Sequence, residues 1–326
     1  MTITDNIQSI FLDQIKRKLK SNESLADELA EILNISRDSA YRRIRGETVL
    51  SLDEAKLLCI RFGISLDNLV TGTGEMVSFH YRAVDAPNFT FDKWLKSLLA
   101  NLESLMPFPD REIIYLANNV PPAYYFNFPL LATFKVFFWM NSLWHVEHLK
   151  GIKFSPKLVP NELIEVGKRF WKRYTDMPRI EIWSVETANT TLSQIEFYYE
   201  AGFFADAGYA PQLCDEYMSM IREVREWATV GYKDKPEQKF SLFKNDLLLP
   251  DTTILFKMGN KRFTMLPCNT MDLLTTSDEM FCKKAEEHLI NLLSKSNLIS
   301  TSGEKARNKF FNEIEEKTLQ LKSRLK

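Results

Sequence analysis

A cluster of polar and basic residues near the N-terminus has the composition of a surface that binds nucleic acid. It contains four arginines and two smaller polar residues: Arg37, Asp38, Ser39, Arg42, Arg43 and Arg45. An arginine guanidinium can donate two parallel hydrogen bonds to the acceptors on a guanine edge, or it can clamp a phosphate. These side chains could therefore read double-stranded DNA if one helix holds them on its exposed face.

The spacing of apolar residues predicts two short helices joined by a tight turn within residues 24–46. The first helix carries a leucine at every fourth position, which predicts one apolar stripe along it: Leu25, Leu29 and Leu33. Ser21 or Asn22 can cap the start of this helix.

The turn and the second helix follow from small polar residues. Asn34 tolerates the left-handed conformation at a helix C-cap, and Ser36 can cap the next helix after one buried residue, Ile35. Ala40 and Ile44 lie four positions apart, so they share the inward face and leave the arginines mostly outside. An ordinary helical hairpin with a solvated basic face is the alternative interpretation.

Two more amphipathic helices flank this pair. The preceding helix has its apolar stripe at Ile7, Ile10, Phe11, Ile15 and Leu19. The following helix has its stripe at Leu52, Ala55, Leu58, Cys59 and Phe62. With the short segment at residues 65–70, five helices fit into one small domain.

Three segments of this region carry a family pattern: LAEILNIS, the arginine-rich helix ending in RG, and SLDEAKLLCIRFGISLDNLV. Together they make residues 7–72 resemble the lambda-repressor-like helix-turn-helix domain of the Cro/cI or XRE type. The sequence departs from that family at Asn34, where glycine is usual. It also has Ala40 and Ile44 where the commonest family pattern has two isoleucines three residues apart.

The resemblance implies roles for the second helix as a recognition helix. Residues at its start would face base edges, with the next pair one turn further on: Arg37, Asp38 and Ser39, then Arg42 and Arg43. Arg45 would either touch a phosphate or hold its own helix end.

The charge of this region bears on how it would bind. Residues 1–74 contain ten Lys or Arg and eleven Asp or Glu, so the basic character is local. Because non-specific affinity grows with the number of neutralised phosphates, one copy would bind DNA weakly. We therefore expect a homodimer on an operator with two half-sites, held together by residues beyond 77.

Composition predicts a chain of two or three domains with a large core. The 326 residues are 45% hydrophobic and 12% aromatic. The four cysteines form no C-x-x-C pair, and the first residues are too polar for a signal peptide, so a cytoplasmic protein is expected. Residues 127–146 are rich in apolar side chains, but Lys135 lies at their middle. We expect a buried core helix there, and no membrane partner.

The predicted organisation is a mainly α, five-helix DNA-binding domain over residues 1–72, a linker over 73–77 and a larger α+β region over 78–326. Glycines and threonines in TGTGEM mark the boundary. Alternating patterns predict strands at 77–84, 111–119, 179–186, 252–266 (two strands about a Gly-Asn turn) and 270–277. A sub-boundary near 235–250 is possible, because residues 240–300 could form a separate lobe or complete the same sheet.

No catalytic motif stands out in the larger region, so we expect neither an enzyme nor a metal or cofactor. His145 and His148 flank Glu147 on a predicted helix and could hold a metal. The H-E-x-x-H order and a third ligand are missing, so a wet or helix-capping pair is the simpler interpretation.

Aromatic residues are dense between residues 124 and 199. Core packing explains most of them, although tyrosine and tryptophan can also line a small-molecule pocket. Trp183, Tyr198 and Tyr199 are the candidates for such a site. Adjacent Tyr198 and Tyr199 cannot both face one core, so at least one should face a cavity, an interface or solvent.

The last predicted helix, residues 303–325, has two adjoining apolar stripes: Phe310, Ile314 and Leu321, then Phe311, Thr318 and Leu325. Such a narrow surface indicates a seam against another helix, either in the body of its own chain or in a second subunit.

These observations favour a one-component transcriptional regulator whose C-terminal region senses a small-molecule effector or a protein partner, or dimerises. A DNA-targeted enzyme with an unrecognised catalytic site is the alternative hypothesis. A third interpretation makes the C-terminal region only a dimerisation body.

Overall fold

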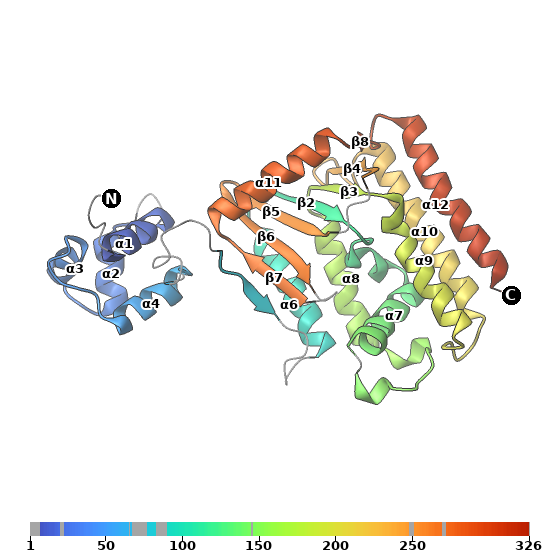
Figure 1. The fold of residues 1–326 in the computed structure, drawn as a ribbon, viewed down its shortest axis with the longest axis horizontal. Coiled ribbons are helices and arrows are strands. Elements are labelled where there is room, and N and C mark those ends of the chain that lie inside the picture. The colour runs from blue at the N-terminus through green and yellow to red at the C-terminus, as the bar shows by residue number, and fades with distance from the viewer. Residues whose placement is uncertain are drawn as a thin grey trace. The chain divides into compact units, whose positions relative to one another are not determined.

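The computed structural model describes residues 7–19, 23–64, 66, 77–82, 90–144, 146–247, 251–268 and 272–325. The chain divides into two compact units, the N-terminal unit (residues 1–78) and the C-terminal unit (residues 79–326) (Figure 1). The described part of the first is helical, and the second combines helices with one sheet. A helical N-terminal region followed by an α+β region is therefore confirmed. Of the predicted linker, only Val77 lies among the described residues.

The described part of the N-terminal unit consists of four helices: α1 (Ile7–Lys18), α2 (Leu25–Leu33), α3 (Arg37–Ile44) and α4 (Leu52–Phe62). Their inner faces share one apolar core, to which each contributes a buried residue: Ile15, Leu29, Ala40 and Leu58. The N-cap of α2 is Ser24, and the predicted caps Ser21 and Asn22 lie outside the described residues. The predicted segment at 65–70 also lies outside them, apart from Leu66.

The apolar stripes of α1 and α4 differ from the predicted ones. Three residues assigned to the inner faces are exposed: Ile7, Ile10 and Leu52. Helix α1 buries the predicted Phe11 and Ile15 together with Leu12, which was not predicted.

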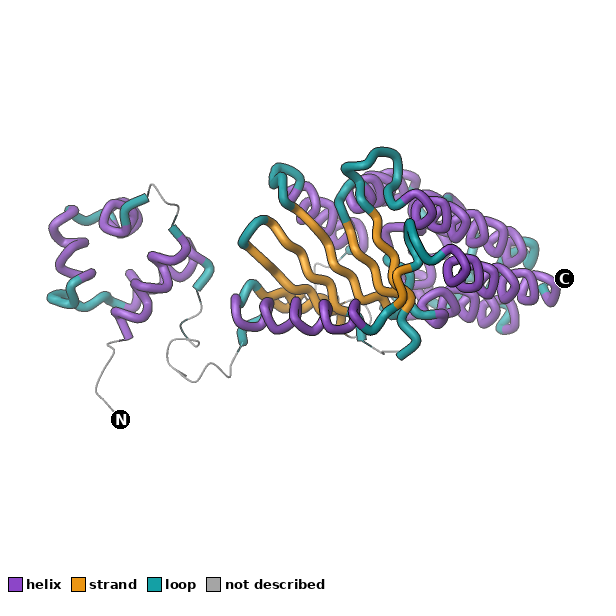
Figure 2. Tube along the Cα trace, turned by 90° about the horizontal axis from the view of Figure 1, so that it is seen from above, coloured by secondary structure: helices purple, strands orange, loops and turns teal. Residues whose placement is uncertain are grey.

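The described strands of the C-terminal unit form a single sheet (Figure 2). This sheet has eight strands among the described residues. They are β1 (His80–Arg82), β2 (Arg111–Ala117), β3 (Arg179–Trp183), β4 (Phe240–Lys244), β5 (Thr253–Met258), β6 (Lys261–Cys268), β7 (Asp272–Thr276) and β8 (Asn297–Leu298). The spatial order is β1-β7-β6-β5-β2-β3-β4-β8, with β2, β3 and β4 mutually parallel and the remaining pairs antiparallel. Strands from both sides of residues 235–250 pair in this sheet, so no sub-boundary separates two lobes there.

Helices cover both faces of the sheet. They are α6 (Phe91–Leu105), α7 (Pro129–Phe138), α8 (Asn161–Thr175), α9 (Val185–Glu200), α10 (Tyr209–Val230), α11 (Glu279–Ser294) and α12 (Glu304–Arg324). Helix α11 packs Leu289 and Leu292 on the face that carries Ile114 and Leu116 of β2. The opposite face of β2 belongs to the large aromatic core under α6, α8 and α10.

Helix α12 packs on its own chain, which decides between the two partners considered above. Phe310, Ile314 and Leu321 are buried in the large core, against α9 and α10. Arg225 of α10 reinforces this contact through an ion pair with Glu315, with Nη1 and Oε1 3.2 Å apart.

Several local predictions hold, and others need correction. The Gly-Asn turn joins β5 to β6, and β7 forms the expected third strand. Strand β3 ends at Trp183 rather than at residue 186, because Ser184 caps α9. Strand β4 was not predicted.

The aromatic segment at 127–146 contains the buried helix α7, which ends at Phe138 and continues as a π-helical turn, Trp139–Leu143. No helix in the described part of the chain combines the length and the apolar character that crossing a bilayer requires.

Candidate nucleic-acid interface

The turn between α2 and α3 has the predicted geometry. Asn34 adopts the left-handed conformation, with φ 53° and ψ 48°. Ser36 caps α3, since its hydroxyl accepts a hydrogen bond of 3.2 Å from the backbone N–H of Ser39. The two helices are thereby joined by a turn of three residues, as the sequence predicts.

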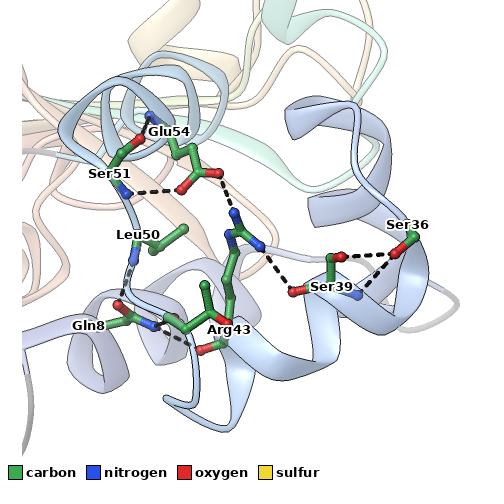
Figure 3. A network of polar contacts seen from close by, with 8 residues as sticks. Gln8, Ser36, Ser39, Arg43, Leu50, Ser51 and Glu54 are labelled. Atoms are coloured by element: carbon green, nitrogen blue, oxygen red, sulfur yellow. Dashed lines mark hydrogen bonds and ion pairs between the residues drawn. The ribbon is translucent and has the colours of Figure 1, made fainter.

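Arg43 is directed into the N-terminal unit, which corrects the prediction that it lies outside. Its side chain is only 15% exposed, and its Nη2 lies 2.7 Å from Glu54 Oε1 on α4. Arg43 Nη1 also donates to the backbone oxygen of Ser39 at 3.2 Å (Figure 3). The arginine turns inward because α4 places a carboxylate beside the last turn of α3, where the apolar spacing alone predicts that the side chain faces solvent.

Glu54 is held in position by a second set of contacts. Its Oε2 accepts a hydrogen bond from the backbone N–H of Ser51 at 2.9 Å, and Ser51 Oγ accepts from the N–H of Glu54, forming a capping box (Figure 3). Burial opposes ionisation of Glu54, but the hydrogen bonds from Arg43 and Ser51 hold its pKa below the ordinary value. Arg43 therefore meets an ionised carboxylate.

Gln8 of α1 ties the end of α3 to the loop that follows it. Its Nε2 donates to the backbone oxygens of Arg43 and Thr48, both at 2.8 Å, and its Oε1 accepts from the N–H of Leu50 at 2.8 Å (Figure 3). One amide thus fixes one backbone group at the end of α3 and two in the loop that follows it. No sequence pattern indicates this role of Gln8, whereas the S-x-x-E pattern of Ser51 and Glu54 could have indicated the capping box.

The three remaining arginines of the cluster are exposed and lie next to acidic side chains. Arg37 Nε is 2.9 Å from Asp27 Oδ1, and Arg45 Nε is 2.6 Å from Glu47 Oε1. Arg42 lies further from the same Glu47, at 3.8 Å. Exposed pairs of this kind contribute little to stability, so a phosphate can replace the carboxylate.

The Arg45–Glu47 contact affects both ionisations. The hydrogen bond and the attraction between them raise the pKa of Arg45. The hydrogen bond from Arg45 is likewise the main cause that lowers the pKa of Glu47. Arg45 is also the C-cap residue of α3, so it lies where either predicted role, phosphate contact or helix end, is possible.

The other predicted residues of α3 differ in exposure. Asp38 is exposed in the first turn, where its charge favours the helix dipole but repels phosphate. Ser39 is half-buried, and its hydroxyl lies 2.9 Å from that of Ser36. Tyr41 was not predicted, yet it is exposed on α3 and lies under the guanidinium of Arg37, 6.0 Å from the ring centre.

The predicted ligand residues lie in the core of the C-terminal unit. Trp183 is fully buried on β3 and donates from Nε1 to Glu181 Oε2 at 2.8 Å. Tyr198 is fully buried on α9, with its hydroxyl 2.6 Å from Ser142 Oγ. Tyr199 is partly buried on another side of that helix. Trp183 packs against Tyr124 and Tyr198 against other rings, so these residues are packing elements rather than an open pocket lining.

A buried ion pair on β3 also escaped sequence analysis. Arg179 and Glu181 have no exposed side-chain surface, and their Nε and Oε1 atoms are 3.3 Å apart. Tyr124 and Tyr174 donate to the same Oε1 of Glu181 at 2.7 and 2.8 Å. Phe240 lies against the guanidinium, with its ring centre 4.5 Å away. Complete burial keeps this network away from any ligand and makes it a structural element of the sheet.

Lys135 on α7 is the second buried charge-bearing residue of interest. Its Nζ donates to Gln194 Oε1 at 2.6 Å and lies 4.4 Å from the ring centre of Tyr125. Burial lowers its pKa to about 7. Lys135 is enclosed by the rings of Tyr125, Phe138 and Trp139, and no carboxylate of the described residues forms an ion pair with it.

The histidine pair considered as a metal site is not supported. His145 lies outside the described residues, and Glu147 and His148 belong to a separate 3-10 turn after α7. Across the described ranges, no three His, Cys, Asp or Glu residues are grouped as a metal ion would require.

Comparisons with protein-family models, with curated proteins and with solved structures each found no match for this chain. The functional argument therefore depends on the geometry of the helix pair and the chemistry of its exposed residues.

Proposed function

We propose that this protein binds double-stranded DNA through α3 and regulates transcription. The single observation that carries the proposal is the outward set of Arg37, Arg42 and Arg45 on a helix that follows a tight left-handed turn. A helix of about 10–12 Å diameter fits the major groove, and arginine is the side chain best suited to guanine edges and phosphates.

The internal contacts of Arg43 support the same proposal. A helix that enters a groove must keep its orientation, because a small rotation moves every base-reading side chain. The Arg43–Glu54 pair and the three hydrogen bonds of Gln8 supply that rigidity from α4 and α1.

The protein acts as a homodimer in this proposal. The N-terminal region has no net positive charge, so two half-sites are needed for useful affinity. The C-terminal unit is the regulatory body, which senses an effector or partner or contributes to dimerisation. Its fully packed Trp183 and Tyr198 are poor candidates for effector contact without a conformational change.

The test is selection of bound duplexes from a randomised DNA library with the full chain, followed by affinity measurements on the enriched sequence. Arg42→Ala should weaken binding by about 1–3 kcal/mol if Arg42 contacts a base. If Arg42 contacts a phosphate, the variant should instead reduce the slope of log affinity against log salt concentration by about one. Arg169→Ala is the matched control, because Arg169 is a similarly exposed arginine in the C-terminal unit. Failure to enrich any sequence would refute the proposal. So would an enriched sequence that the wild-type chain, Arg42→Ala and Arg169→Ala bind with equal affinity and equal salt dependence.

A further inference from the structure

The outer face of α4 is unusually apolar for a surface helix. Leu52 is 83% exposed, Ile60 is 71% exposed and Leu57 is 49% exposed, although the same helix buries Ala55 and Leu58 on its inner side. Three large aliphatic side chains exposed along one short helix indicate a surface that is covered by a partner.

Charged residues on that face are arranged by sign. Asp53 lies in the first turn, Arg61 in the last, and Lys56 between them. Within the ranges that the structure describes, none of these three side chains forms an ion pair. The face therefore has a free acidic end and a free basic end.

Asp53, Leu57 and Arg61 are spaced by four residues, so they follow one another along the helix. Turning a second copy of α4 end for end brings its Arg61 opposite Asp53 and its Leu57 opposite Leu57. The same register places Leu52 and the second copy's Ile60 along the same edge of the pair. One arrangement thus pairs Asp53 with Arg61 and Leu57 with itself, and it leaves Lys56, about 100° round the helix from Leu57, at the edge of the pair.

We propose that the outer face of α4 binds α4 of a second copy of this chain in an antiparallel pair. A two-fold axis passes near Leu57, as an isologous interface requires. The occupant is a second copy because Asp53 and Arg61, at opposite ends of the face, have opposite charges and Leu57 lies midway between them. This inference rests on the homodimer of the proposed function and places a contact in the N-terminal unit, in addition to any made by the residues beyond 77 that the sequence indicates; the contact should form without DNA.

The size of the surface sets the expected strength. A single pair of short helices buries less than the roughly 800 Å² per partner of a standard stable interface, so the dimer should be weak and concentration-dependent. We expect the wild-type chain to form dimers in sedimentation velocity without DNA as its concentration rises towards about 100 μM.

Cross-linking tests the register. Leu57→Cys should give a covalent dimer with a short bismaleimide, because the two copies of residue 57 meet at the axis. Leu52→Cys should not, since the two copies of residue 52 lie near opposite ends of the pair. The wild-type chain provides the background from its own four cysteines.

Charge reversal tests the ion pairs. Asp53→Arg and Arg61→Asp should each weaken the dimer, since each places like charges opposite one another, and the double variant should restore it. Dimers that persist in both single variants, with no preference for cross-linking at residue 57, would overturn the proposal. So would a wild-type chain that stays monomeric throughout. Because no DNA is present, either result leaves the DNA-binding proposal to its own test.

Discussion

Arg43 and Glu54 connect α3 to α4 through a contact of 2.7 Å between Nη2 and Oε1, in which both side chains are mostly shielded from solvent. This pair separates the arginines of α3 into two groups. Arg43 serves the internal structure of the N-terminal unit, whereas Arg37, Arg42 and Arg45 remain available outside. Substitutions in the two groups should therefore have different consequences.

Arg43→Ala should destabilise the N-terminal unit by about 1.5–3 kcal/mol, because it removes charge-assisted hydrogen bonds and leaves Glu54 without its cation. All six tryptophans lie between residues 94 and 227, so tryptophan fluorescence reports the C-terminal unit alone. We expect a helical transition in circular dichroism to move to lower temperature while the fluorescence transition stays in place. Arg42→Ala, the exposed neighbour, should shift neither. Equal stability of the two variants would contradict the assigned role of Arg43.

Glu47→Gln should strengthen DNA binding if α3 is the DNA-binding helix. Glu47 contacts both Arg42 and Arg45, so its carboxylate competes with phosphate for the same guanidinium groups. Glutamine keeps the size of the side chain and removes the charge. Fluorescence anisotropy with a selected duplex should show tighter binding across a salt series. Glu31→Gln, an exposed change on α2, is the control for a general gain in positive charge; an equal effect from both variants would mean that Glu47 has no special position.

Glu181→Gln should destabilise the C-terminal unit by about 3–5 kcal/mol, since it leaves the buried Arg179 without its only counter-charge among the described contacts. The loss should appear in denaturant unfolding followed by tryptophan fluorescence, to which the neighbouring Trp183 contributes directly. Glu165→Gln on the exposed side of α8 is the matched control. A loss no larger than that of the control would show that the buried pair contributes little.

Local patterns predicted the parts of the molecule that depend on neighbouring residues. Asn34, Ser36 and the Gly-Asn turn at Gly259 were identified because each acts within a few positions of itself. The seam of α12 followed in the same way from its apolar stripes, and the shortness of the heptad pattern favoured a partner within its own chain.

The features that sequence analysis missed depend on contacts between distant parts of the chain. Gln8 forms hydrogen bonds with backbone groups 35 to 42 positions away. It lies in the first turn of α1, and no local sequence pattern indicates such distant partners. Arg179 and Glu181 alternate with apolar residues on β3, which predicts a half-solvated strand. The structure places both in the core, where Tyr124 and Tyr174 from other elements donate hydrogen bonds to Glu181 and Arg179 donates to Tyr124.

Lys135→Met should stabilise the C-terminal unit at neutral pH and flatten its dependence on pH. Burial lowers the pKa of Lys135 to about 7 from 10.5. Between these values the unfolded chain holds the lysine proton while the folded chain has released it. The free energy of unfolding therefore rises with pH across this window, by up to about 1.4 kcal/mol per pH unit, and the cost of burying the lysine is largest below pH 7.

Denaturant unfolding followed by tryptophan fluorescence between about pH 7 and pH 9 measures this slope. Above that range the buried Cys214, whose pKa burial raises to about 12, has the opposite effect on stability, but it is present in both proteins and cancels in their difference. Methionine suits the site because it keeps the length of the side chain and packs well against the rings of Tyr125 and Trp139. The exposed Lys153→Met is the control and should leave the slope unchanged. If the unfolding free energies of wild type and Lys135→Met change in parallel with pH, the lysine keeps its proton throughout, stabilised by those rings and by Gln194.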